Sequence, residues 1–313
     1  MKFAALVALV TPASGFFLSS KHQTTRLKIL PVEAKIVNTD SELTSLAGYF
    51  VDNFWVPQVA EITADQRAGL VTTQVQDFIN RYGDIMGKRR LTSALLVDED
   101  MAGVCGVELT LVARNTQTVV SRDQGEMMIK SAISRFTPKE RKLLKFFEIK
   151  DLVADVLDGE FDVVPVLSNL AVGTGMRRGG VGMKLCQAVE KICSEWDFEE
   201  IWLQVEEQNT PARRLYENKL GYTQEWKVNG GSVLRVDTDD PEGSFSESVA
   251  PLLVLSKRLG GGAKRTPNAR SSAAPVSTPS QDVDEWLAAL DEATGNTYYY
   301  STVSGETSWD PPS

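Results

Sequence analysis

The groups best suited to chemistry lie between Val163 and Tyr222. An apolar, β-branched run from Val163 to Val172 predicts a strand, and a glycine-rich turn follows it and opens an amphipathic helix. Glycines let a ligand approach the backbone, and the free N–H groups and dipole of a helix N-terminus favour an anion. Arg177 and Arg178 add forked, positively charged donors. The turn therefore predicts a site for a phosphate group.

The glycine spacing fits neither of the two common nucleotide-binding patterns. The turn has no Gly-Lys-Ser/Thr sequence, and Gly173 and Gly175 stand too far before Gly179 for G-x-G-x-x-G. The pattern that is present is R-x-x-G-x-G, from Arg177 to Gly182. A second pattern follows downstream and consists of Asn209, Ala212, Leu215, Tyr216, Gly221 and Tyr222.

These two linked motifs resemble the GNAT superfamily of acetyl-CoA-dependent N-acetyltransferases, whose N-x-x-A-x-x-L-Y-x-x-x-G-F/Y segment is matched nearly residue for residue. The run Leu167 to Val172 with the paired arginines is similar to the plastid and bacterial ribosomal-protein or protein N-terminal acetyltransferase branches. The resemblance implies an α/β (α+β) fold with a central mixed, mostly antiparallel twisted sheet flanked by helices. It also implies acetyl-CoA as co-substrate and no metal.

By this resemblance the coenzyme pyrophosphate lies on backbone N–H groups of the turn. The pantetheine arm runs beside the central strand, and an asparagine fixes the arm from the other side. The residues expected to bind the coenzyme are Leu170, Ala171, Val172, Arg177, Arg178, Gly179, Gly180, Val181, Gly182 and Asn209.

The resemblance also assigns the candidate catalytic residues. Tyr216 stands where the family often has the group that protonates the coenzyme A thiolate, and a phenol has a pKa of about 10. Gln204 occupies the position of the usual glutamate base and cannot accept a proton. Glu206, on the same face of the strand, is the first candidate for the base, and Glu108 is the second. The alternatives are that Tyr216 is only a core residue and that Glu108 faces outward from its strand.

Composition excludes several other classes of protein. The net charge of −9 over 313 residues argues against a general nucleic-acid binder. The only histidine, His22, precedes the folded region, which excludes histidine-based catalysis and makes a zinc site improbable. Cys105, Cys186 and Cys193 have neither disulfide-framework nor metal-ligand spacing. Cys186 and Cys193 are seven apart, which predicts two small core residues on one helix face.

The chain from 1 to 33 has the character of a targeting presequence. An apolar run over residues 3–10 is typical of a signal peptide, and a buried strand is the alternative. After Phe16 and Phe17 a hydroxylated, basic stretch free of acids resembles a transit peptide, and the whole resembles the bipartite plastid presequence of algae with secondary plastids. We expect its removal and import into a plastid, with secretion as the alternative.

Residues 34–259 are predicted to form the acetyltransferase domain. A short strand at 35–37, helices at 43–55 and 64–82, and a hairpin of 91–97 with 104–113 precede the central strand. The segment 115–160 predicts an inserted helical element near the acceptor site, with a helix from Thr137 and Pro138 that continues through Phe147. The last strands are expected at 225–236 and 252–257.

The C-terminal part is predicted to be a linker and a small binding module. Residues 260–280 are rich in Gly, Ser, Pro and Ala and contain no acid, which is typical of a flexible linker. Residues 281–313 resemble a WW domain, a three-stranded sheet that binds proline-rich peptides. By that resemblance the peptide groove contains Tyr298, Thr307 and Trp309. The acidic residues of this module, with no Lys or Arg, favour ligands with basic residues beside their prolines.

The sequence thus predicts an N-acetyltransferase for protein amines, either N-terminal α-amines or lysine ε-amines, with a WW domain that recruits proline-rich partners. No membrane or nucleic-acid partner is expected. Three alternatives stay open: an acetyltransferase for small amines such as polyamines, an inactive adaptor that acts through the WW domain, and nucleotide binding without acetyl transfer.

Overall fold

The computed structural model describes residues 34–83, 91–98, 100–260, 286–290, 297–301 and 307–308. The chain divides into two compact units, 1–261 and 262–313. The predicted presequence and nearly all of the predicted linker lie outside the described residues. No helix of the described part is long and apolar enough to cross a membrane.

The N-terminal elements confirm the predicted strand and two helices. Thr63 begins the second helix with a capping box, because its side chain accepts from the Gln66 N–H while the Gln66 side chain accepts from the Thr63 N–H. A π-helical segment continues the first helix and keeps Trp55 buried. The elements are β1 (Ala34–Val37), α1 (Asp40–Phe50), η1 (Val51–Trp55), η2 (Val56–Gln58) and α2 (Ala64–Tyr82).

A predicted hairpin and an inserted helical segment come next. Thr137 caps a helix as expected, and Glu140 completes the capping box. The helix was expected to run through Phe147 but ends at Leu143, and a 3-10 segment follows it. Leu144 is buried, whereas Phe146 and Phe147 are exposed and therefore add no buried contacts that would extend the helix. The elements are β2 (Ser93–Asp98), β3 (Gly103–Ala113), β4 (Thr118–Val120), α3 (Arg122–Ser134), α4 (Pro138–Leu143), η3 (Leu144–Phe146) and α5 (Ile149–Val156).

The central stretch has the predicted order of strand, turn, helix, strand and helix. The last of these helices is only one α-helical turn before it continues as a π-helix, and Gly221 ends it in the left-handed conformation with φ 79°. The elements are β5 (Asp162–Val172), η4 (Thr174–Met176), α6 (Val181–Glu195), β6 (Glu200–Glu206), α7 (Thr210–Arg213) and η5 (Arg214–Leu220).

Two long strands, β7 (Thr223–Asp237) and β8 (Ser244–Arg258), complete the first unit. The prediction that the last strand begins at Leu252 was wrong. The polar residues from Ser244 onward pair with β7, and Phe245 packs on Trp55 with ring centroids 4.7 Å apart. Pairing with β7 and the contact with Trp55 therefore stabilise a strand in residues whose sequence does not indicate one.

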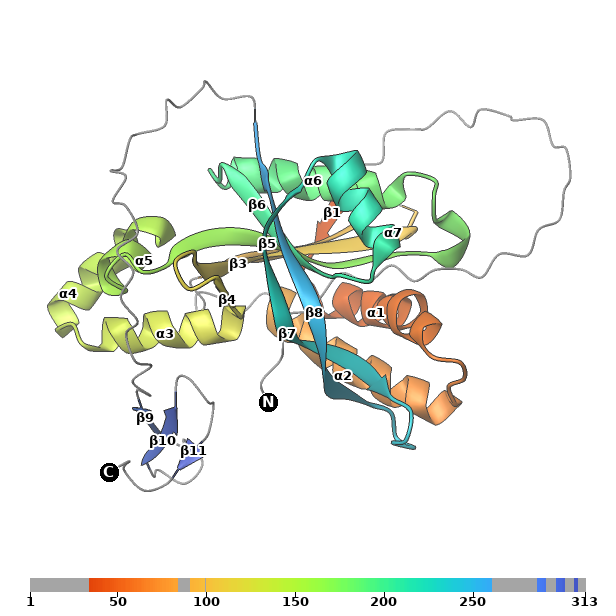
Figure 1. Cartoon of the computed structure of the whole chain (residues 1–313), viewed down its shortest axis with the longest axis horizontal. Helices are drawn as coiled ribbons and strands as arrows, with labels where there is room; N and C mark the ends of the chain where they lie inside the picture. The colour runs from red at the N-terminus through yellow and green to blue at the C-terminus, as the bar shows by residue number, and fades with distance from the viewer. Residues whose placement is uncertain are drawn as a thin grey trace, which may run out of the picture. The chain divides into compact units, whose positions relative to one another are not determined.

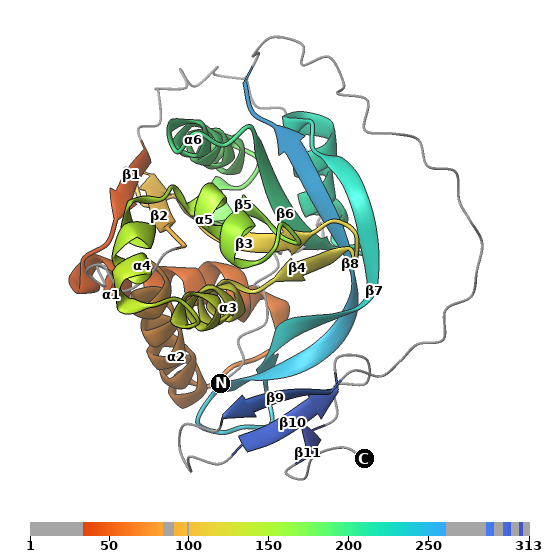
Figure 2. The ribbon, with the colours of Figure 1, turned by 90° about the vertical axis from the view of Figure 1, so that its left-hand side faces the viewer.

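The main sheet has the order β1-β2-β3-β5-β6-β8-β7, with β4 beside β3. Only β5 and β6 pair in parallel, and every other pair is antiparallel. Figure 1 shows α6 and α7 on one side of this sheet and α1 and α2 on the other. Figure 2 shows α3, α4 and α5 grouped together and β7 and β8 running side by side. This mixed, mostly antiparallel sheet flanked by helices confirms the predicted fold.

The second unit contains a three-stranded antiparallel sheet, which confirms the predicted WW architecture. Its order is β11-β10-β9, and Trp286 of the first strand pairs with Ser301 of the second. The strands are β9 (Trp286–Leu290), β10 (Thr297–Ser301) and β11 (Thr307–Ser308).

Candidate active site

The main sheet opens between β5 and β6. These strands pair only at Val166–Trp202 and Leu167–Leu203, although β5 continues to Val172 and β6 to Glu206. Between Val104 and Gly106 the β3 strand advances two residues while its partner β5 advances three, so β5 holds one extra residue. A bulge of this kind bends its strand and locally ends pairing. The bulge therefore turns β5 away from β6 and leaves a gap in the middle of the sheet.

Asn169 is the bulge residue with left-handed backbone. Its φ is 51°, and its side chain is fully buried. A non-glycine residue in this conformation stores strain, which surrounding contacts must hold. The Asn169 Nδ2 donates to the hydroxyl of Tyr82, while its Oδ1 has no hydrogen-bond partner in the described structure. The hydrogen bond from Asn169 to Tyr82, the last residue of α2, thus holds the bulge in place.

The N-terminus of α6 lies beside the end of β5. A Cβ at Gly182 would contact the Val172 side chain at 3.4 Å, which shows how close the two elements are. Gly180 precedes the helix with φ 89° and no side chain caps it. The first intrahelical bond runs from the Lys184 N–H to the Gly180 carbonyl, so the preceding N–H groups have no intrahelical partner. These N–H groups and the helix dipole fit an anion.

The two arginines of the turn have different roles. Arg178 is exposed, has φ 64°, and makes no ion pair within the described residues. The guanidinium of Arg177 donates to the carbonyls of Val172 at 3.1 Å and of Asn53 at 2.8 Å. Arg177 thus ties the end of β5 to the N-terminal helices, and its predicted contact with the coenzyme stays a prediction.

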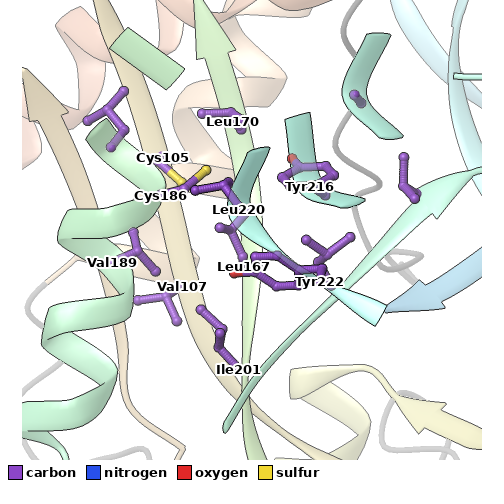
Figure 3. Packing of buried hydrophobic residues seen from close by; sticks show 14 of the residues in the cluster. Cys105, Val107, Leu167, Leu170, Cys186, Val189, Ile201, Tyr216, Leu220 and Tyr222 are labelled. Atoms are coloured by element: carbon purple, nitrogen blue, oxygen red, sulfur yellow. The ribbon is translucent and has the colours of Figure 1, made fainter. Parts of the chain in front are cut away.

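Tyr216 lies in the π-helical segment and is completely buried. Figure 3 shows its ring close to that of Tyr222, beside the strand that carries Leu170, and the two ring centroids are 5.8 Å apart. Its hydroxyl has no hydrogen-bond partner in the described structure. Burial, together with the nearby Cys186, raises the pKa of Tyr216 well above its usual value. The phenol is therefore protonated across the physiological range and available as a hydrogen-bond donor.

Asn209 begins α7 at the end of β6. Its side-chain oxygen accepts from the Ala212 N–H at 3.3 Å, and its own N–H donates to the Glu206 carbonyl at 2.9 Å. The side chain is buried. Asn209 therefore acts as the N-cap of α7 at the end of β6, and its predicted contact with the coenzyme stays a prediction.

The opposite side of the gap holds a network of buried charged and polar groups around Glu108. Arg81 donates from Nη1 to both carboxylate oxygens of Glu108, at 2.9 and 3.1 Å, and from Nε to Asp77 at 2.7 Å. Glu108 is 5% exposed, so its interpretation as an outward-facing residue was wrong. Burial raises the pKa of Glu108, but the charges of Arg81 and Arg122 outweigh burial and hold this pKa below its usual value.

Tyr82 connects this network to the bulge. Its hydroxyl lies 3.1 Å from Glu108 Oε1 and 3.0 Å from Ser168 Oγ, and it also accepts from Asn169. A Cβ at Gly106 would lie 2.3 Å from this hydroxyl, so glycine is needed there. Burial raises the pKa of Tyr82 well above its usual value, and the charge of Glu108 adds to the effect.

Glu206 differs from Glu108 in its hydrogen bonding. Its Oε2 accepts from Arg235 Nη2 at 2.7 Å, whereas its Oε1 is buried without a partner in the described residues. Arg235 comes from β7 and is 32% exposed, so water reaches this ion pair from one side. Glu206 thus keeps one carboxylate oxygen free to accept a proton or a hydrogen bond.

A pocket joins Glu108 to the start of the inserted helices. Gln204, at the expected base position, also borders it. The pocket is lined by Arg81, Glu108, Thr110, Val119, Val120, Ser121, Arg122, Asp123, Val166, Ser168 and Gln204. The insertion therefore contributes residues to this pocket, while its predicted place beside the acceptor stays a prediction.

Sequence reasoning missed Arg81, Tyr82, Ser168 and Asn169 as parts of the site. The sequence could have indicated Ser168 and Asn169, because two adjacent polar residues interrupt an apolar strand there. Polar residues in such a buried position usually have hydrogen-bond partners or a function. No local signal marked Arg81 and Tyr82, which sit at the end of an ordinary amphipathic helix.

The three cysteines are buried, unpaired core residues, as predicted for Cys186 and Cys193. Figure 3 shows the sulfurs of Cys105 and Cys186 close together beneath Leu170. Burial raises the pKa of the Cys193 thiol to about 12, so it is unreactive at neutral pH. Within the described ranges no group of three or more His, Cys, Asp or Glu residues is placed to hold a metal.

The predicted peptide groove is described only through its backbone. Tyr298 pairs with Ala289, and Thr307 pairs with Tyr300. Since residues two apart on a strand and residues directly opposite share a face, Tyr298 and Thr307 occupy one face of the sheet. Trp309 lies outside the described residues.

Two family models match parts of this chain. Residues 158–222 match the family model described as acetyltransferase (GNAT) family, and residues 283–312 match the model of the WW domain. The chain thus carries a GNAT acetyltransferase domain and a WW domain. A search of the curated proteins finds no match.

The chain is also similar, at low identity, to solved structures of acetyltransferases. The ribosomal-protein-S18-alanine N-acetyltransferase from Escherichia coli is 13% identical, with a TM-score of 0.37, over 75% of this chain and 99% of that chain. Arabidopsis thaliana NAA60 in complex with acetyl-CoA is 16% identical, with a TM-score of 0.40, over 74% and 99%. Ribosomal-protein-alanine N-acetyltransferase from Brucella melitensis is 15% identical, with a TM-score of 0.40, over 73% and 100%.

Proposed function

We propose that this protein transfers the acetyl group of acetyl-CoA to protein amines. The observation that carries the proposal is the gap between β5 and β6, which lies beside the uncapped N-terminus of α6. We place the long, phosphate-bearing thioester between the unpaired parts of these two strands. Val166 and Ser168 of β5 and Gln204 of β6 also line a polar pocket, through which an amine would approach.

The coenzyme would be held mainly by backbone groups. The N–H groups from Arg178 to Gly182 suit the pyrophosphate, and the exposed Arg178 side chain adds a positive charge. Leu170, Ala171 and Val172 would lie along the pantetheine arm, because they form the part of β5 that has left β6. Asn209 would face the arm from the end of β6.

The acceptor amine would approach through the pocket that Gln204 borders, and Glu206 lies two residues further along the same strand. An amine must lose its proton before it attacks a thioester. Glu206 has a carboxylate oxygen without a partner, whereas both oxygens of Glu108 are bound by Arg81 and its pKa is lowered. We therefore assign the base to Glu206, directly or through one water, and assign to Glu108 the role of holding Arg81 and Tyr82.

Tyr216 would stabilise the departing sulfur. Because its pKa is raised, complete proton transfer from Tyr216 to a thiolate is uphill, and a hydrogen bond from the phenol is the favoured contribution. This refines the expectation from sequence, in which an ordinary phenol pKa allowed full protonation.

The WW domain supports a protein rather than a small amine as acceptor. A module of this family binds proline-rich peptides, and its joining to the transferase through a Gly, Ser and Pro-rich segment raises the local concentration of a bound protein near the site. We further propose that the first 33 residues direct the protein to a plastid, where acetyl-CoA and the acceptor would both be present.

The test is thiol release from acetyl-CoA with three acceptors: a peptide with a free N-terminus and no lysine, an N-terminally blocked peptide with one lysine, and spermidine. We expect turnover with at least one peptide and acetylation of that peptide by mass spectrometry. The preferred peptide then identifies the α-amine or the ε-amine as acceptor.

Turnover with spermidine alone would contradict the protein-acceptor proposal and favour a small-amine enzyme. Coenzyme A binding without any turnover would favour an adaptor that acts through the WW domain. Tyr216→Phe tests the role of the phenol, and Tyr222→Phe is its matched control. Both hydroxyls are buried without a hydrogen-bond partner in the described structure, but only that of Tyr216 is expected to face the reacting sulfur.

A further inference from the structure

The inserted helices expose an unusual cluster of apolar side chains. Eight large apolar residues of the described structure are exposed, and four of them, Met127 and three near the end of α4, belong to this insertion. Leu143 is 58% exposed, Phe146 is 87% exposed and Phe147 is 43% exposed. Single exposed apolar residues are normal, but three within five positions are not. We call these three residues the apolar tip; Figure 2 shows α4, where the tip begins.

Positively charged residues are concentrated in the chain around the apolar tip. Residues 139–150 contain five Lys or Arg against two Glu, in a chain whose net charge is −9. Lys139, Arg141 and Lys142 are exposed, and none of them forms an ion pair within the described residues. We call these three residues the basic rim. Cations held apart from acidic partners are available to an anionic surface.

We propose that the apolar tip and the basic rim dock this protein onto an anionic lipid surface. Segments at the membrane interface combine Phe and Leu, which enter the acyl boundary, with Lys and Arg, which contact the lipid phosphates. Residues 139–150 contain both the apolar and the basic side chains that such a segment needs. The proposal concerns a surface away from the gap and does not rest on the proposed acetyl transfer.

Other occupants fit the observations less well. A single-stranded nucleic acid would use the cations and stack on the phenylalanines, but it offers nothing to Leu143, and the chain as a whole is acidic. A second copy of the chain would bring two basic rims together, which like-charge repulsion opposes. An anionic bilayer satisfies the aliphatic, aromatic and charged residues at once.

The experiment places an environment-sensitive fluorophore on the tip of the full chain through Phe146→Cys. The three native cysteines are buried, so the label reacts with the introduced thiol. We expect a blue shift of emission with phosphatidylglycerol vesicles and no shift with phosphatidylcholine vesicles. Val249→Cys is the matched control, because Val249 is 73% exposed on β8 and lies outside the insertion. The control label is expected to stay in water with either vesicle.

A second variant tests the charge contribution while leaving the fluorophore position unchanged. Replacing the basic rim by Lys139→Glu, Arg141→Glu and Lys142→Glu is expected to weaken vesicle binding by more than about a hundredfold, since each basic residue near the surface contributes about fivefold. Thermal melting with an unchanged midpoint shows that the variant is folded.

Three results would overturn the proposal. The absence of a blue shift at position 146 with anionic vesicles would contradict the proposal directly. An equal shift at position 249 would mean that the apolar tip is not the part of the chain that enters the lipid. A shift with a single-stranded oligonucleotide but not with vesicles would assign the surface to nucleic acid instead. A shift that grows with protein concentration in the absence of lipid would assign it to a second copy.

Discussion

Two carboxylates flank the gap in the sheet, and their surroundings differ sharply. Glu108 on β3 is surrounded by donors, since Arg81 binds both oxygens and Tyr82 and Ser168 lie within 3.3 Å of Oε1. Glu206 on β6 has one ion pair and one oxygen without a partner. We interpret a carboxylate with both oxygens bound by an arginine as a structural anion, while one with a free oxygen can take a proton. The comparison teaches that burial alone does not mark a base.

Removing the charge of Glu206 and of Glu108 in separate variants is the strongest test of the difference between the two carboxylates. Glu206→Gln is expected to lower kcat about 10²- to 10⁴-fold, the usual range for a general base, whereas Glu108→Gln should lower kcat per folded molecule far less. Steady-state rates with the preferred acceptor measure both. Equal losses in the two folded variants would contradict the assignment.

Arg81→Met is expected to destabilise the fold by about 3–5 kcal/mol, because it leaves Asp77 and Glu108 as buried, unpaired charges. Urea unfolding measures this free energy. The matched control is Arg67→Met, which breaks an ion pair with Asp52 that is nearly half exposed on both sides and is worth about 0–1 kcal/mol. Similar losses in both variants would show that the network around Glu108 is not a buried unit.

Tyr216→Phe is expected to lower kcat about tenfold to a hundredfold, the value of one hydrogen bond to a charged group. Tyr222→Phe, whose ring centroid lies 5.8 Å from that of Tyr216, should leave kcat unchanged. A loss of the same size in both would mean that Tyr216 only packs in the core.

The lowered pKa of Glu108 predicts a pH effect on stability. A depressed folded-state pKa gives stability that is present above the unfolded value of 4.5 and lost as pH falls through the folded pKa. Urea midpoints measured from pH 6 to pH 3 should therefore fall on acidification, and they should fall less in Glu108→Gln. An unchanged slope in this variant would argue that Glu108 is not the ionised group.

The smallest effect separates the two arginines of the turn. Arg178→Ala is expected to raise KM for acetyl-CoA about two- to fivefold, as for one exposed charge contact, with no change in stability. Arg177→Ala should instead lower stability, because its guanidinium holds the carbonyls of Val172 and Asn53. Steady-state rates measure KM for acetyl-CoA in the two variants, and urea unfolding measures their stability.

Local patterns in the sequence predicted much of the fold and named part of the candidate site. The strand from Val163, the helix from Val181 and the cap at Thr137 all follow from periodicity and end signals within a few residues. The glycine turn and Tyr216 were found because linked motifs carry them. These features depend on neighbours in the chain, which a sequence displays directly.

The remaining features depend on contacts between distant residues. Arg81 and Glu108 are 27 residues apart, and Asn169 adopts its left-handed backbone while bonded to Tyr82, 87 residues earlier. Arg177 turned inward because η1 offers it the Asn53 carbonyl, 124 residues away. Similarly, Ser244 begins a strand because its partner Asp237 extends β7. No local pattern encodes such pairs.

The central claim is that acetyl-CoA lies between β5 and β6, and amide hydrogen exchange with and without acetyl-CoA tests it most directly. We expect the coenzyme to slow exchange in residues 168–183 and 203–210, with no change in β1 and β2 at the far edge of the same sheet. Binding that protects another part of the chain and leaves 168–183 unchanged would contradict the claim.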